Sequence, residues 1–120
     1  MTFQEIKNFI SGIEDPVARL EFVMDLGRDL LCVPETAVCT EIVGCSSLVE
    51  ICRDGDKFYG RADSVLVRGL VAIILSMVDG KTPDEIRKMP MDSMFADLKL
   101  NLGASRLNGV NSIIRFFKNL

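Results

Sequence analysis

Residues 47–63 read SLVEICRDGDKFYGRAD, two runs of alternating apolar and polar residues on either side of an Asp-Gly pair. Alternation with a period of two is typical of half-buried strands, and Asp-Gly is a strong signal for a tight hairpin turn. With residues 54–55 as the turn, Ile51 faces Phe58 on the side of the hairpin that we expect to be buried. The segment therefore predicts an antiparallel β-hairpin.

Helical patterns flank this hairpin on both sides, and residues 41–43 predict a short third strand before it. Helices, then a small antiparallel sheet, then further helices are typical of an α+β domain. We expect one domain over residues 1–120, with about three antiparallel strands packed against N- and C-terminal helices. The expected helices cover about residues 3–13, 16–27, 64–79, 83–89, 92–100 and 105–118, with a connecting loop at 30–40.

Several of these helices have recognisable first residues. Thr2 and Thr82 are each followed three positions later by a glutamate, which is the capping-box pattern. Asp15 precedes a proline and is expected to cap the second helix. For the long apolar helix that begins near residue 65, Asp63 and Ser64 are both candidate N-caps, and a plain cap is the simpler role for Asp63.

The composition limits the classes of function. Hydrophobic residues make up 48% of the 120 residues, enough for a buried core. The net charge of −3 disfavours nucleic acids and anionic membranes as partners, and the absence of histidine removes the commonest general base and metal ligand. The longest apolar stretch, 65–78, contains Arg68 and is too short to span a bilayer, and no signal peptide is visible. We expect a cytoplasmic protein with reduced cysteines.

Four cysteines are the candidate chemical groups: Cys32, Cys39, Cys45 and Cys52. Their spacings lack the CxxC pairs that bring two thiolates to one metal ion, so we expect no metal site. Free cysteine is a small residue that is often buried, and this interpretation suits all of them except Cys45. For Cys52 it is weaker, because the expected hairpin register brings it beside Lys57 on the outer face.

Cys45 is set apart by its neighbours. Gly44 and Ser46 favour a turn, so the thiol is expected at a loop tip where a partner can reach it. Backbone N–H groups of the loop or a nearby arginine could lower the pKa of this thiol and make it more nucleophilic. Cys45 is therefore the candidate functional residue, against the alternative of an ordinary turn cysteine.

Several segments together resemble the SufE family of sulfur-acceptor proteins, whose fold is related to IscU-type scaffolds. They are IVGCSS before the hairpin, ADSVLVRGLVAII after it, RLEFVMDLGRDL, KTPDEI and SRLNGV. The resemblance covers most of the chain in the family's order. It implies an accessory protein, not an enzyme, whose loop cysteine takes persulfide sulfur from a cysteine desulfurase, stimulates that enzyme and passes the sulfur on.

Carried onto this sequence, the resemblance makes Cys45 the persulfide acceptor. The implied partners are a SufS-type desulfurase, which holds the pyridoxal phosphate, and an iron–sulfur scaffold of the SufB or SufBCD type. No cofactor is expected on this chain itself. Arg106, at the start of the last helix, matches the family's SRxxGL element and could steady a thiolate or dock the partner, against the alternative of a solvated arginine. Asp63 matches an acidic position before the central helix.

The chain departs from the family pattern at several positions. Thr40 and Ser46 stand where the family commonly has asparagine and glutamine, and Glu50 replaces a tryptophan. Glu50 lies within reach of Lys57 or Arg61 for charge pairing. Two alternatives to the carrier remain: an IscU-like scaffold that builds a cluster on cysteines, and a helical interaction module with inert thiols. Gly109 is interpreted as a close-packing position.

Overall fold

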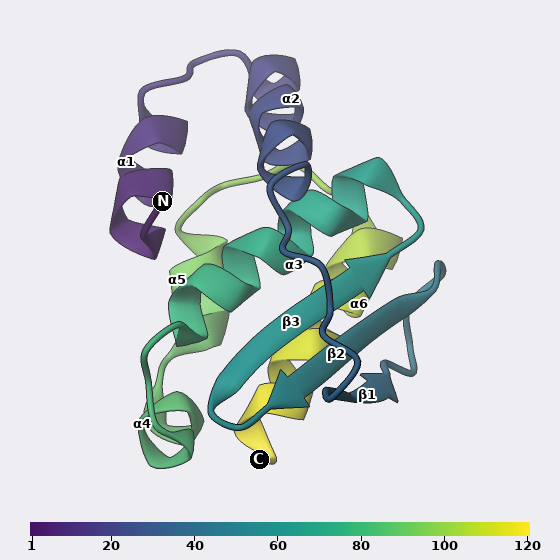
Figure 1. Ribbon diagram of the computed structural model, residues 1–120. Coiled ribbons are helices and arrows are strands. Elements are labelled where there is room, and N and C mark those ends of the chain that lie inside the picture. Colours follow the sequence, from purple (N-terminus) through teal and green to yellow (C-terminus); the bar gives the residue numbers. More distant parts are fainter.

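The computed structural model describes residues 1–120, which form six helices and a three-stranded antiparallel sheet (Figure 1). This is the α+β class that the sequence predicts. None of the helices combines the length and the hydropathy that crossing a membrane requires. The elements in chain order are α1 (Phe3–Ser11), α2 (Pro16–Gly27), β1 (Val38–Glu41), β2 (Val49–Asp54), β3 (Lys57–Ala62), α3 (Val65–Val78), α4 (Pro83–Lys88), α5 (Met91–Ala96) and α6 (Ala104–Lys118).

The hairpin of β2 and β3 forms as expected, but its turn lies one residue later. Ile51 pairs with Gly60 and not with Phe58. The two turn residues are therefore Gly55 and Asp56 rather than the Asp-Gly pair. Gly55 has a φ of 61°, and a glycine with positive φ at the first central position is the arrangement of a type II′ turn. Because the partners shift by two residues, every side chain keeps its expected face.

The third strand exists, but earlier in the chain than residues 41–43. β1 begins at Val38, inside the segment expected to be a loop, and pairs antiparallel with β2 at the edge of the sheet. In this register Cys39 lies directly opposite Cys52. The expected partner of Cys52 in the hairpin, Lys57, is replaced by Tyr59.

Helices α3 and α6 cover one face of the sheet and form the core with it. Gly60 of β3 leaves room for Val71 of α3, and the ring of Phe58 meets that of Phe117 in α6 edge-on, with centroids 5.1 Å apart. Burying each large apolar side chain of this kind contributes about 1.5–3 kcal/mol. The largest fully buried side chains are Phe117, Ile10, Ile51, Leu70, Ile73, Ile74, Ile86, Met91, Ile113 and Ile114.

The opposite face of the sheet is crossed by the segment between α2 and β1, residues 28–37 (Figure 1). This segment has no regular secondary structure. Leu30 and Cys32 from it, together with Glu50 and Arg61 from the sheet, line a cavity of about 660 Å³. The outer face is therefore covered by a strip of chain rather than by a helix.

Two glycines set the distance between α2 and α3. A Cβ on Gly69 would overlap the backbone carbonyl of Val23, and a Cβ on Gly27 would lie 2.7 Å from the Gly69 nitrogen. Glycine at both positions lets the two helix backbones touch. This contact fixes the N-terminal half of α3, which leads out of β3.

The capping signals identify the helix starts with one exception. Thr2, Asp15 and Thr82 cap α1, α2 and α4 as expected. For α3 the cap is Ser64, whose hydroxyl accepts a hydrogen bond from the Val67 N–H, so the interpretation of Asp63 as the N-cap is wrong.

Helix α5 is shorter than residues 92–100. It ends at Ala96, and Lys99 follows with a φ of 52°, which is left-handed backbone that no helix of L-residues continues through.

Candidate functional site

The candidate site is built on the loop of residues 42–48, which joins β1 to β2. Ile42 is buried, and its N–H donates to the carbonyl of Val49 at 2.9 Å, so the base of the loop is closed by a backbone hydrogen bond. At the tip Gly44 has a φ of 96°, a conformation that side chains other than hydrogen rarely adopt. The turn residues noted in the sequence thus form the expected loop.

The thiol of Cys45 points inward from this loop rather than into solvent. Its Sγ lies 3.7 Å from the carbonyl oxygen of Gly109 in α6, to which the thiol donates a hydrogen bond. Cys45 is half-buried, whereas Val43, Gly44 and Ser46 around it are exposed. The expectation of an accessible thiol is therefore wrong for this conformation, although the loop that carries it is at the surface.

Burial raises the pKa of the Cys45 thiol. Removing a thiolate from water disfavours the charged form, and nothing close to Sγ offsets that cost. The expectation that loop N–H groups or an arginine would lower this pKa is wrong here. In this conformation Cys45 is held as a neutral thiol and is a poor nucleophile at neutral pH.

A small cavity of about 20 Å³ surrounds the thiol. Arg106 lies on its rim in the first turn of α6, is exposed, and has no ion-pair or hydrogen-bond partner. A free guanidinium next to a thiol can stabilise the thiolate once the loop moves. The lining residues are Cys45, Ser46, Ser47, Val67, Leu70, Ser105, Arg106, Gly109, Val110 and Ile113.

Two close contacts fix the loop against α6. A Cβ on Gly44 would lie 2.5 Å from the hydroxyl oxygen of Ser112, and a Cβ on Gly109 would lie 3.4 Å from Cys45 Sγ. The buried Gly109 leaves room for the sulfur, which agrees with its interpretation as a close-packing position. The carbonyl of Gly109 and the side chain of Ser112 are the contacts that the sequence did not reveal, because they depend on how α6 packs against the loop.

Asp63 lies apart from this arrangement. It is exposed and lines the larger cavity on the outer face of the sheet with Arg68, and its N–H donates to the Leu48 carbonyl at 3.2 Å. The structure therefore brings Gly44, Ser46 and Arg106 to Cys45, but not Asp63.

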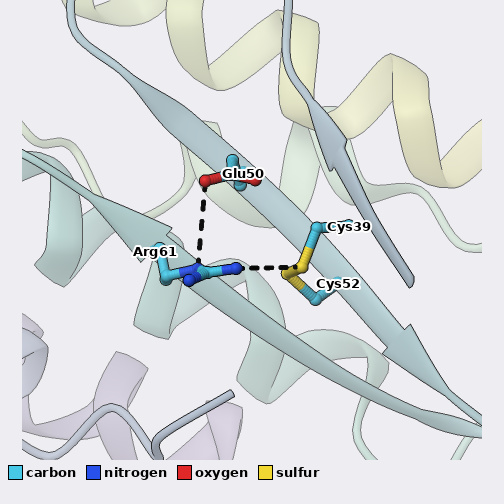
Figure 2. Close-up of a disulfide and its surroundings, with 4 residues drawn as sticks. All are labelled: Cys39, Glu50, Cys52 and Arg61. Carbon is cyan, nitrogen blue, oxygen red and sulfur yellow. Dashed lines mark hydrogen bonds and ion pairs between the residues drawn. A yellow bond between two sulfur atoms is a disulfide. The ribbon is translucent and has the colours of Figure 1, made fainter. Parts of the chain in front are cut away.

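The other cysteines differ from the expected buried, reduced thiols. Cys39 and Cys52 are joined by a disulfide (Figure 2). Cys32 is a free, exposed thiol. Cys52 is fully buried as expected, but by pairing across the strands. No three cysteine, aspartate or glutamate side chains come together where they could hold a metal ion.

Glu50 forms one of the two charge pairs considered for it. Its carboxylate lies 3.9 Å from Nε of Arg61, the residue directly opposite on β3. The same guanidinium donates a hydrogen bond to Sγ of Cys39 at 3.2 Å, so Arg61 links the ion pair to the disulfide (Figure 2).

Comparison with known proteins adds an independent observation. The family model described as "SufE: Fe-S metabolism associated domain" matches residues 4–120. An uncharacterised SufE-like protein of Rhizobium meliloti is 34% identical, with 92% of this chain and 86% of the relative covered. The sulfur acceptor protein CsdE of Escherichia coli is 29% identical over 94% and 83%, and the cysteine desulfuration protein SufE of Wigglesworthia glossinidia is 32% identical over 94% and 84%.

A solved structure has the same fold. The solution structure of a hypothetical protein from Thermus thermophilus superposes with a TM-score of 0.78, covering 99% of this chain and 94% of the other at 12% identity. That similarity concerns the fold, whereas the family match spans the loop, the hairpin and α6 that form the site. The chain belongs to the SufE family.

Proposed function

We propose that this chain is a sulfur acceptor and carrier that takes persulfide sulfur from a cysteine desulfurase onto Cys45. The observation that carries the proposal is the position of Cys45 on a surface loop whose two ends are fixed and whose thiol rests in a small cavity. The names of CsdE and SufE, given to relatives that match over more than four-fifths of their length, support it.

The proposed transfer needs no net oxidation or reduction. Cys45 loses its proton, and its thiolate attacks the terminal sulfur of the partner's persulfide. The S–S bond in the partner breaks as a new one forms at Cys45, and the partner's cysteine leaves as a thiolate. Because burial raises the pKa of Cys45, the thiol must leave its cavity before it reacts. The partner would cause this opening when it docks on the loop.

Arg106 is the residue that would assist the exposed thiolate. It is the one cation on the rim of the Cys45 cavity, and its guanidinium is unpaired. Gly44 and Ser46 would let the loop move and be approached closely. Asp63 is too separate in the fold to act on Cys45, so any role for it concerns the partner.

The remaining parts of the proposal concern partners. A SufS-type desulfurase would hold the pyridoxal phosphate and generate the persulfide, and this chain would stimulate it without being an enzyme itself. A scaffold of the SufB or SufBCD type would receive the sulfur in the cytoplasm. A scaffold role for this chain is disfavoured, because Cys32, Cys45 and the disulfide pair lie in different places.

The experiment is a sulfur-acceptance assay. The protein is incubated with a SufS-type desulfurase, pyridoxal phosphate and cysteine, and mass spectrometry is used to find one added sulfur atom that a reductant removes. We expect it on Cys45. Cys45→Ser should neither accept sulfur nor stimulate the desulfurase, while Cys32→Ser, which removes the exposed thiol, should do both. Acceptance by Cys45→Ser would overturn the proposal.

A second pair of variants tests Arg106. Arg106→Gln should slow sulfur acceptance without changing thermal stability, whereas Arg115→Gln, on the same helix and also exposed, should behave as wild type. If both variants accept sulfur at the same rate, Arg106 does not assist the transfer.

A further inference from the structure

The disulfide between Cys39 and Cys52 connects the edge strand β1 to the central strand β2 (Figure 2). Both residues lie on the outer face of the sheet, opposite to the face that carries Val49 and Ile51. Cys52 is fully buried, while Cys39 is only partly covered. A reagent that exchanges with this bond therefore meets the sulfur of Cys39.

A cation lies beside that sulfur. Nη2 of Arg61 donates a hydrogen bond to Sγ of Cys39 at 3.2 Å, and the Arg61 side chain is more than half exposed. After reduction, the same group would stabilise a thiolate on Cys39. Stabilising the reduced form of a disulfide makes the bond easier to reduce. Arg61 therefore favours a redox-active disulfide over an inert structural one.

The outer cavity lies next to the pair through Arg61, which contacts Cys39 and also lines the cavity. Arg61 and Glu50 line this cavity of about 660 Å³ together with Cys32. It is large enough to admit the reactive end of a small dithiol or of a protein thiol. Disulfides in reducing compartments are usually transient or redox-sensing, which fits a pair whose Cys39 sulfur is partly exposed.

The bond also encloses the candidate site. The residues between Cys39 and Cys52 contain the whole 42–48 loop, with Cys45 near their middle. β1 has four residues, and its only neighbour in the sheet is β2. Once the bond is reduced, β1 is held by strand pairing, by the burial of Ile42 and by exposed polar contacts such as that of Arg61 with Cys39, and short edge strands of this kind open easily.

We propose that Cys39 and Cys52 form a reversible dithiol–disulfide couple that controls how readily the Cys45 loop opens. In the oxidised form the ring holds β1 in the sheet and Cys45 in its cavity. In the reduced form β1 detaches more often, and Cys45 becomes accessible. The couple and the loop opening stand independently of the proposed function, whereas the effect on sulfur uptake rests on it.

The reductant supplies two thiols, carried by one dithiol or by two molecules of glutathione. One of its thiolates attacks Sγ of Cys39, which forms a mixed disulfide and releases Cys52 as a thiolate that takes up a proton. The second thiol, deprotonated, then attacks the reductant's sulfur in the mixed disulfide and releases Cys39 beside Arg61. Two electrons pass to the protein, and the two thiols become a disulfide.

The test measures two quantities on the same protein. Wild type is equilibrated in mixtures of reduced and oxidised glutathione, desalted, and analysed by mass spectrometry for the Cys39–Cys52 bond and for adducts. The rate at which iodoacetamide modifies Cys45 is then measured for each form by peptide mapping. We expect Cys45 to react at least about tenfold faster in the reduced protein, since a cross-link around a loop of this length shifts its opening by that order or more.

Two outcomes would overturn the proposal: failure of the bond to form in any glutathione mixture, or equal Cys45 rates in the two forms. Cys39→Ala/Cys52→Ala should react at the fast rate in every mixture. If this variant does not fold, the comparison of oxidised with reduced wild type is sufficient to test the proposal. Sulfur acceptance, measured separately, should rise with reduction. If Cys45 alkylation changes tenfold between the two forms but Cys45 accepts no sulfur, the proposed function is contradicted, whereas redox control of the loop is not.

Arg61 provides a matched test of the chemistry. Arg61→Gln should need a more reducing mixture to open the bond, by several-fold in the equilibrium constant, because the reduced Cys39 would lose the cation that lies beside its sulfur. Arg53→Gln removes a cation from the other face of the hairpin, where it lies over Phe58, and should leave the midpoint unchanged. If the two variants are half-reduced in the same glutathione mixture, Arg61 has no role in the Cys39–Cys52 couple.

Discussion

The Sγ of Cys45 lies 3.7 Å from the backbone oxygen of Gly109, so the loop sulfur rests against the middle of α6. A side chain larger than that of alanine at position 109 would occupy the space that the thiol uses. The contact therefore joins a residue of a surface loop to the core helix.

Gly109→Ala should be tolerated. The added Cβ would lie 3.4 Å from Sγ, an ordinary contact, and alanine favours a helix over glycine by about 1 kcal/mol. We expect urea denaturation to show equal or slightly higher stability, with the alkylation rate of Cys45 unchanged. Gly109→Leu, by contrast, should force the thiol out and raise that rate. An unchanged rate in Gly109→Leu would mean that the contact does not hold Cys45.

The reactivity of Cys45 should depend on pH in a shifted range. Since burial raises its pKa, the folded protein keeps the proton to higher pH than the unfolded chain does, so this group stabilises the fold below its unfolded pKa. That contribution is lost as the pH rises through the folded pKa. A plot of the iodoacetamide rate against pH should show Cys45 becoming reactive at a higher pH than an ordinary cysteine thiol, because burial raises its pKa.

Cys32 serves as the internal comparison in the same experiment. It is exposed, so at neutral pH it should be modified before Cys45, contrary to the order expected from an accessible loop tip. Peptide mapping at short reaction times separates the two sites. Faster modification of Cys45 would show that the loop is already open in solution.

Gly44→Ala should destabilise the protein by about 1–3 kcal/mol. The φ of 96° is unfavourable for alanine, and the new Cβ would lie 2.5 Å from the Ser112 hydroxyl oxygen. Ser112→Ala in the same chain removes the oxygen and should recover part of the loss, but not the backbone strain. A double-mutant cycle in urea measures the recovered part, and zero coupling would contradict the contact.

Gly69→Ala should be among the most damaging single substitutions. Its Cβ would overlap the Val23 carbonyl, and neither helix backbone can give way without separating α2 from α3. We expect a loss of more than about 3 kcal/mol, or no soluble protein. Gly12→Ala, whose Cβ would meet its neighbours only at ordinary contact distances, should change stability by less than about 1 kcal/mol. Thermal unfolding of both variants makes the comparison.

Local signals predicted the elements, and long-range packing decided the details. Capping residues such as Thr2 and Thr82 act within one turn, so the sequence identified those helix starts correctly. The hairpin turn was wrong by one residue because Asp-Gly and Gly-Asp both suit a two-residue turn, and alternation gives the face of a strand but not its partner. The prediction that the face of the hairpin carrying Ile51 is buried was confirmed, since Ile51 is buried.

The site shows the same division. Glycine and serine around Cys45 were enough to predict its loop, but the direction of the thiol depends on α6, about sixty residues away in the chain. The disulfide depends on where β1 begins. With a strand at 41–43, Cys39 lies outside the sheet; with β1 starting at Val38, it is opposite Cys52. The spacing of the cysteines in the sequence does not distinguish these two positions of the strand.

The closed base of the 42–48 loop limits how far the sulfur can travel. The hydrogen bond from Ile42 to Val49 fixes both ends of the loop, and Cys45 follows Ile42 by only three positions. Fully extended, that stretch of chain reaches about 10 Å. As long as β1 stays paired with β2, any persulfide that this protein accepts must be brought within that radius of the sheet edge, so a partner's sulfur has to lie in a shallow cleft or on a mobile arm of its own.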